Sequence, residues 1–200
     1  IVFVWINAFK LPKEKEVHEK IPAPTEDNIK KEEDSIKVSL VDGDQIDVKE
    51  ENMLAVIIEN HSASRPQMEG LADASLVFEA EAEGGITRFL AFFPYQNNEK
   101  VGPVRSVRPY FVRWAEQFNS AFAHAGGSND GLAAIYNSSH LLNLDGLALE
   151  GGDKYFVRDH NYYAPHNLFT NLKELRERMD DLGWDKPLKY PFAIFGELQD

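Results

Sequence analysis

The sequence contains no cysteine, and this absence removes several kinds of chemistry at once. Without thiols, the 200-residue segment has no disulfide, no thiolate nucleophile and no cysteine-ligated zinc or iron-sulfur site. It also lacks the GxSxG, HExxH, Walker and GxGxxG patterns that are typical of common hydrolases, metalloproteases and nucleotide-binding proteins. Redox chemistry would need a bound cofactor, and no motif suggests one, so we expect none.

Basic residues are scarce relative to acidic ones. The chain has 21 Lys and Arg against 33 Asp and Glu, which gives a formal net charge of -12. Proteins that hold nucleic-acid backbones need an excess of positive charge, so we expect no nucleic-acid partner. A hydrophobic content of 43% is enough to bury one sizeable core.

Long hydrophobic runs are missing as well, although the chain opens on the short apolar stretch IVFVWINAF. A bilayer-spanning helix needs about 20 apolar residues, so this stretch is too short to cross a membrane alone. We interpret residues 1–10 as the end of a truncated membrane anchor or signal segment, because a polar linker follows directly. The alternative is a short apolar leader that packs as a strand.

Residues 11–53 are predicted to be a charged flexible linker, with Pro12, Pro22 and Pro24 and no apolar stripe. A small hairpin around Asp42 and Gly43 is possible at the end of this linker. The globular domain is predicted to span residues 54–200. It begins with LAVIIEN, a nearly continuous apolar run that is typical of a central strand covered on both faces.

A double glycine, Gly84-Gly85, separates the alternating segments SLVFEAEAE and ITRFLAFF, and this pattern predicts a two-residue β-hairpin. An unbroken register would place Glu81 opposite Arg88 as a cross-strand ion pair. It would also put Phe78 on the same face as Phe89, with Leu90 on the other face. We expect Glu79 and Glu83 to be solvated surface residues.

Four arginines follow this turn, with only Glu99 and Lys100 as charged neighbours, in a chain that is otherwise acidic. Pro109 is well placed to begin a helix, so Arg105 and Arg108 are expected to precede a helix N-terminus. Donors concentrated in this way predict an anion-binding clamp. The competing interpretation is that the arginines pair with glutamates of the preceding strand. The four arginines are Arg88, Arg105, Arg108 and Arg113.

The segment FAHAGGSNDG predicts a short strand through His124, a turn at Gly126-Gly127 and a helix capped by Ser128 or Asn129. Open α/β sheets place ligands at such strand ends, which makes Gly126 and Gly127 candidate ligand contacts. His124 is a weak catalytic candidate, because a histidine on an apolar strand is more often a satisfied core residue.

The block YFVRDHNYYAPHNLFT brings polar residues into an aromatic loop, which comes before a helix that Asn171 is expected to cap and Gly183 to end. His160 and His166 match no compact ligand spacing, so we expect no metal. The stronger expectation is that a buried His166 or Asn167 fixes the loop backbone. Arg158, His166 and Asn167 are nevertheless candidate ligand contacts, and Asp159 is a weak catalytic candidate.

The segments EGGITRFLA, GPVRSVRPYF, HAGGS and RDHNYYAPHNLFT, in this order, resemble the bacterial YerB-type family of lipoproteins, whose domain has no known function. The resemblance covers about residues 54–183. It implies an extracytoplasmic envelope protein tethered at its N-terminus, with a layered sheet-and-helix domain and a further C-terminal domain. This chain lacks the lipid-anchor cysteine and ends near the expected start of that second domain. By motif, the family's marked positions fall on Gly84, Gly85, Arg88, Arg105, Arg108, His124, Gly126, Gly127, Arg158, His166 and Asn167.

The expected fold is therefore α/β in the mixed α+β sense, a layered sandwich of a mixed or antiparallel sheet with helices packed on it. The first functional hypothesis is a non-enzymatic envelope module, anchored to the cell membrane by its N-terminus. It binds an anionic ligand, such as a phosphorylated lipid or a wall polymer, or an envelope protein, through Arg88, Arg105, Arg108 and Arg158. The second hypothesis is a phosphotransferase or hydrolase that acts on polyprenyl-pyrophosphate-linked envelope polymers, with Asp159 or Glu81 as base. It rests on a fainter resemblance to the LytR-CpsA-Psr phosphotransferases. A third is a scaffold whose arginines only join strands.

Overall fold

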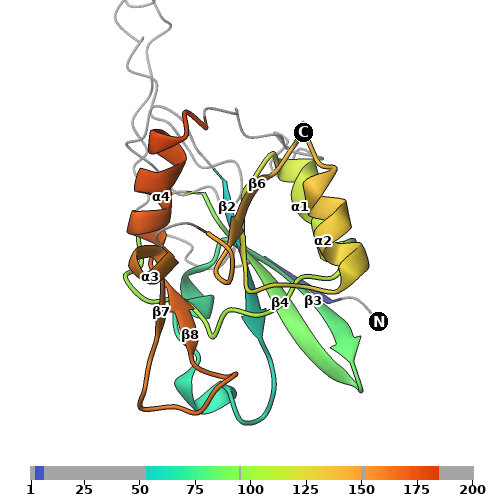
Figure 1. Cartoon of the computed structure of the whole chain (residues 1–200). Coiled ribbons are helices and arrows are strands. Elements are labelled where there is room, and N and C mark those ends of the chain that lie inside the picture. Colours follow the sequence, from blue (N-terminus) through green and yellow to red (C-terminus); the bar gives the residue numbers. More distant parts are fainter. Residues whose placement is uncertain (1–2, 7–52, 95, 150–151, 185–200) are drawn as a thin grey trace, which may run out of the picture.

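The computed structural model describes residues 3–6, 53–94, 96–149 and 152–184. Within these residues the centre of the fold is a six-stranded mixed sheet with strand order β1-β3-β4-β2-β5-β6 (Figure 1). The strands are β1 (Phe3–Ile6), β2 (Leu54–Glu59), β3 (Leu76–Glu83), β4 (Ile86–Phe93), β5 (Ala121–His124) and β6 (Leu142–Asp145).

Strand β2 lies in the middle of the sheet, as its apolar run predicts, and every one of its residues is buried. It pairs antiparallel with β4 and parallel with β5, which in turn runs parallel to β6. The carboxyl ends of β2, β5 and β6 therefore lie at one edge of the sheet. In open α/β sheets this edge is where ligands bind.

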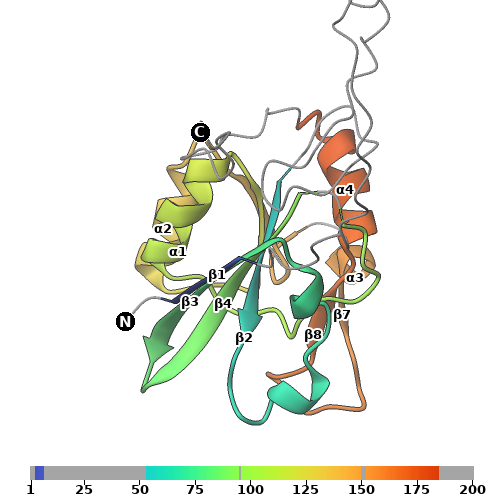
Figure 2. The ribbon, with the colours of Figure 1, turned by 180° about the vertical axis from the view of Figure 1, so that it is seen from behind.

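Each face of the sheet is covered by its own layer, as the two views in Figures 1 and 2 show. On one face, Phe111 and Ile135 from the helices α1 (Pro109–Ala115) and α2 (Asn129–Tyr136) pack against Phe92 and Phe122 of the sheet. The other layer consists of α3 (Gly152–Tyr155), β7 (Phe156–Arg158), β8 (Leu168–Thr170) and α4 (Leu172–Asp181). This arrangement confirms the expected layered α+β sandwich. Single turns of 3-10 helix occur at η1 (Arg65–Gln67), η2 (Leu71–Asp73) and η3 (Glu116–Phe118).

The local signals for helix ends are confirmed. Pro109 is the first residue of α1, where its missing N–H costs nothing. Ser128 caps α2 by accepting a hydrogen bond from the Gly131 N–H, and Asn171 caps α4 in the same way through Glu174. Gly183, with φ of 62°, follows the end of α4.

The Gly84-Gly85 hairpin is also confirmed, with φ of 60° and 76° at the two glycines. The predicted register is wrong, because a β-bulge lies between Glu81 and Glu83 and adds one residue to β3. Arg88 therefore lies opposite Ala80, and Glu81 lies opposite Thr87, so the expected Glu81–Arg88 ion pair does not form.

The same bulge also reverses the predicted faces, since a shift of one residue moves side chains to the other side of a sheet. Phe78 lies opposite Leu90 and shares its face, whereas Phe89 lies on the other. Leu90 and Phe92 are nevertheless both fully buried, because both faces of the sheet are covered here.

The N-terminal apolar stretch contributes β1, which pairs antiparallel with the edge of β3. These four residues take the extended form that the strand alternative predicts. The other residues of the 1–10 stretch and the possible hairpin near Asp42 lie outside the described residues. Of the expected linker only Met53 is described, and it is buried in the core. None of the helices in the described ranges is long and apolar enough to cross a membrane.

Candidate functional site

The segment from Val101 to Arg108 forms the carboxyl edge of the sheet by crossing between β2 and β5. The Arg105 N–H donates to the carbonyl of Ile57 in β2, and the Arg105 carbonyl accepts from the N–H of Ala125 just after β5. On its other side, the Val104 N–H donates to the Leu168 carbonyl of β8. The backbone therefore holds the Arg105 side chain where the sheet and the β7–β8 layer meet.

Glu59, the last residue of β2, is the buried charge of this edge. Only 4% of its side chain is exposed, and each carboxylate oxygen has a basic partner. Oε1 lies 3.0 Å from Nε of Arg105, and Oε2 lies 2.8 Å from Nδ1 of His166. A buried carboxylate is costly unless it is paired, so these two contacts account for its place in the core.

The contact with Glu59 determines which ring nitrogen of His166 carries the proton. An ionised carboxylate only accepts hydrogen bonds, so Nδ1 donates and Nε2 of the neutral ring keeps its lone pair. The ring stacks on His61 at 5.0 Å between centroids. Its Nε2 has no hydrogen-bond partner among the described residues, and 22% of the side chain is exposed.

Arg88 and Arg108 meet at Glu83, on the tip of the β3–β4 hairpin. The Glu83 carboxylate pairs with Nη2 of Arg88 at 2.7 Å and with Nη2 of Arg108. Arg88 is 5% exposed at its side chain and also donates to the Ser106 carbonyl at 2.6 Å, whereas 54% of the Glu83 side chain is exposed. The alternative that the arginines pair with β3 glutamates is therefore realised, through Glu83 rather than Glu81.

The surroundings of this pair lower the pKa of both Glu83 and Arg88. Partial burial works to raise the pKa of Glu83, but the hydrogen bond from Arg108 and the positive charges of both arginines outweigh it, so that pKa is lowered. Burial, and then the positive charge of Arg108, lower the pKa of Arg88. The positive charge of Arg105 also works to lower the pKa of Arg88.

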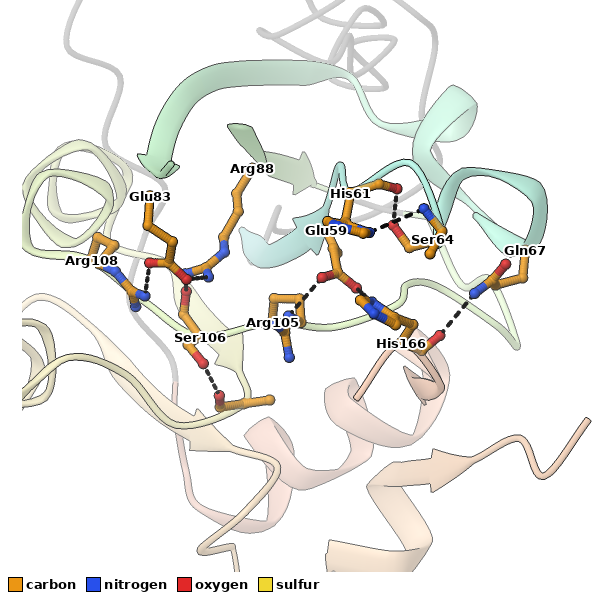
Figure 3. Close-up of polar contacts among 12 residues, drawn as sticks. Glu59, His61, Ser64, Gln67, Glu83, Arg88, Arg105, Ser106, Arg108 and His166 are labelled. Atoms are coloured by element: carbon orange, nitrogen blue, oxygen red, sulfur yellow. Dashed lines mark hydrogen bonds and ion pairs between the residues drawn. The ribbon is translucent and has the colours of Figure 1, made fainter. Parts of the chain in front are cut away.

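The arginines and carboxylates that pair at this edge, together with the histidine on Glu59, form what we call the charged row, shown in Figure 3. The row contains three arginine charges against two carboxylates, before any charge on the histidine is counted. Arg105 lies between its two halves, and neither of its terminal nitrogens, Nη1 and Nη2, has a partner in the described part of the chain. The charged row consists of Arg108, Glu83, Arg88, Arg105, Glu59 and His166.

Arg158 and Asn167, two further candidate ligand contacts, lie on and beside the β7–β8 ribbon. Arg158 is exposed and its Nη1 donates to Oδ1 of Asn167 at 2.9 Å. Strand β8 lies between Arg158 and the segment that carries Arg105. Asn167 is buried and its amide donates to the carbonyls of Asp159 and Tyr162, so it fixes the loop.

The Gly126-Gly127 turn after β5 is engaged in hydrogen bonds and close packing within the domain. The Gly126 N–H donates to Oδ1 of Asp145, and the Gly126 carbonyl accepts from the Val107 N–H. A Cβ on Gly127 would lie 2.6 Å from Val107 Cγ1, so close packing against the crossing segment requires glycine there.

The three weak catalytic candidates lie in local networks. His124 is fully buried, with Nδ1 against the Gly126 carbonyl and Nε2 against Oδ1 of Asn143. Asp159 pairs with Lys100 at 2.9 Å, and the hydrogen bond from Lys100 lowers the pKa of Asp159. Glu81 is exposed and accepts a hydrogen bond from the Gly85 N–H. In the described ranges, no group of three or more acidic or histidine side chains is placed to hold a metal.

Sequence reasoning missed Glu59 and His61 and undervalued Glu83. The signal for the first two was present, because polar residues directly after a fully apolar central strand mark a carboxyl edge. No local signal marks Glu83, because its role depends on the bulge.

The fold and the charged row define a mixed α+β domain with a cationic site at the carboxyl edge of its sheet. Residues 42–185 match the family model described as "Protein of unknown function (DUF3048) N-terminal domain". The chain belongs to this family.

Two comparisons point to the same relative. The sequence is 40% identical over 137 residues to "Putative lipoprotein YerB" of Bacillus subtilis, which covers 68% of this chain and 40% of the relative. The crystal structure of the Bacillus subtilis YerB protein matches with a TM-score of 0.67 and 32% identity, over 82% of this chain and 56% of that one. The chain thus matches 40% of the relative's sequence and 56% of its solved structure. The YerB-type resemblance is confirmed, and lipoproteins as a class are membrane-anchored.

Proposed function

We propose that this chain is part of an extracytoplasmic, membrane-tethered protein of the cell envelope that binds an anionic ligand through the charged row. The ligand class is a phosphorylated lipid or a phosphate-bearing wall polymer. The tether and the location rest on the lipoprotein name of the relative, and the binding role rests on the site.

One observation supports the binding role above all others. Arg105 is held beside a buried carboxylate while its two terminal nitrogens have no partner within the described residues. A guanidinium offers these nitrogens as a planar fork that matches phosphate oxygens. The charged row carries one more arginine charge than carboxylate charge, so an anion completes its charge balance.

The scaffold alternative makes a different prediction for Arg105. If the arginines only joined strands, each would be expected to use its donors on the protein itself, as Arg88 does with Glu83 and Ser106. The terminal nitrogens of Arg105 depart from this pattern. Arg105 is therefore the residue on which binding and scaffolding can be separated.

Calorimetric titration with geranyl pyrophosphate and with a teichoic-type polymer tests the proposal. Arg105→Lys keeps a positive charge beside Glu59 but removes the fork, so we expect its affinity to fall about tenfold while the fold is retained. Arg113→Gln, which removes an exposed arginine of α1, is the matched control and should bind as the wild type does. Absence of binding to both ligands, or equal binding by all three proteins, would overturn the proposal.

A further inference from the structure

The pairing of His166 with Glu59 gives the charged row a group that the binding proposal does not use. Nδ1 of His166 donates to a carboxylate whose side chain is 4% exposed, so the carboxylate fixes both the ring orientation and the tautomer. The other ring nitrogen, Nε2, is left as a proton acceptor. Carboxylate-oriented histidines of this kind are the usual proton carriers of hydrolytic sites.

Arg105 and His166 are bound to the two oxygens of the same carboxylate, at 3.0 and 2.8 Å. The unpartnered nitrogens of Arg105 and Nε2 of His166 thus belong to neighbouring groups on one anchor (Figure 3). A phosphoryl group held by Arg105 would lie beside the histidine. A water molecule between them would be within reach of the base.

We infer that the charged row hydrolyses a phosphoanhydride bond, with His166 as general base and Glu59 as positioning residue. This inference rests on the proposed binding function. The water oxygen forms a bond to phosphorus as the bridging P–O bond breaks. The water proton passes to Nε2 of His166, the leaving phosphate departs with the bridging electron pair, and His166 then releases its proton to solvent.

The side chains of the charged row favour hydrolysis of a phosphoanhydride over hydrolysis of a phosphate ester. The row supplies one base and three cations, and an arginine guanidinium does not give up its proton at ordinary pH. A poor leaving group such as an alcohol would need an acid to protonate it. A phosphate leaving group does not, and the arginines stabilise the negative charge that it gains.

The decisive variant is His166→Asn. The Asn amide can replace Nδ1 as the donor to Glu59, but it has no counterpart of Nε2. We expect hydrolysis of inorganic and geranyl pyrophosphate by the full chain, assayed both with magnesium and with EDTA, to fall at least about 100-fold in this variant. Its affinity for methylenediphosphonate, which cannot be hydrolysed, should stay within about twofold of wild type, or ~0.4 kcal/mol, because the guanidinium of Arg105, and not the His166 ring, holds the anion.

Two further proteins complete the experiment. His160→Asn, an exposed histidine of the same loop, should keep full activity. Glu59→Gln should lower kcat for pyrophosphate hydrolysis much more than it changes KM, because the His166 ring loses the carboxylate that orients it. A purely structural Glu59–His166 pair would not have this effect.

The outcomes separate the two proposals. If the wild type binds methylenediphosphonate but hydrolyses neither pyrophosphate, the catalytic inference is wrong and the binding function stands. If His166→Asn hydrolyses as fast as the wild type, His166 is not the base. If the wild type binds none of methylenediphosphonate, geranyl pyrophosphate and the teichoic-type polymer, the proposed function fails together with the inference.

Discussion

Glu83 pairs with two arginines at once although 54% of its side chain is exposed to solvent. An exposed carboxylate is inexpensive to release, because water replaces its partners, whereas the buried Arg88 guanidinium needs a negative partner. Glu83 therefore occupies the position that an anionic ligand would take on Arg88 and Arg108. We interpret it as a competitor of the ligand at one end of the charged row.

Glu83→Gln should accordingly strengthen anion binding. Removing the carboxylate charge leaves Arg88 and Arg108 without a competing anion, and we expect the Kd for geranyl pyrophosphate to fall about three- to tenfold, or roughly 0.6 to 1.4 kcal/mol. Titration calorimetry of the variant measures this change. Glu81→Gln, two positions away and exposed, should leave Kd unchanged. Weaker binding by Glu83→Gln would show that Glu83 organises the arginines for the ligand and does not compete with it.

Among the elements, the β3–β4 hairpin shows what a sequence pattern can and cannot determine. Gly84-Gly85 predicts the turn because both positions need positive φ, and the structure has it. The bulge between Glu81 and Glu83 is invisible in the run EAEAE, since each alternation of that run looks the same. The helix start at Pro109 and the helix caps at Ser128 and Asn171 are predictable because their causes are local.

Gly85→Ala tests the conformational account of this turn. A Cβ on Gly85 would contact nothing within 4 Å, so any loss arises from its φ of 76° alone. We expect the free energy of unfolding to fall by about 1 kcal/mol, the usual cost of a left-handed conformation for an L residue. Gly85→Asn should lose less, because asparagine tolerates this region. Chemical denaturation measures both variants, and equal losses would contradict the account.

Over the whole molecule, the site is assembled from parts far apart in the sequence. Glu59 ends the central strand, Glu83 ends a hairpin strand, Arg105 lies on the crossing segment and His166 on a loop of the opposite layer. Sequence motifs identified Arg105, Arg108 and His166 as candidates, but only the packing of the layers brings them to Glu59. Their pairing could not be predicted, because no sequence spacing encodes a contact between residues 59 and 166.

Nuclear magnetic resonance of the wild-type chain during titration with methylenediphosphonate tests the central claim most directly. The claim is that Arg105 binds the anion and that His166 lies directly beside it. It predicts that the side-chain Nε–H signal of Arg105 and the ring signals of His166 shift together, saturably, while the signal of exposed Arg113 stays in place. The claim would be contradicted if no signal shifted, or if the shifts centred on arginines outside the charged row.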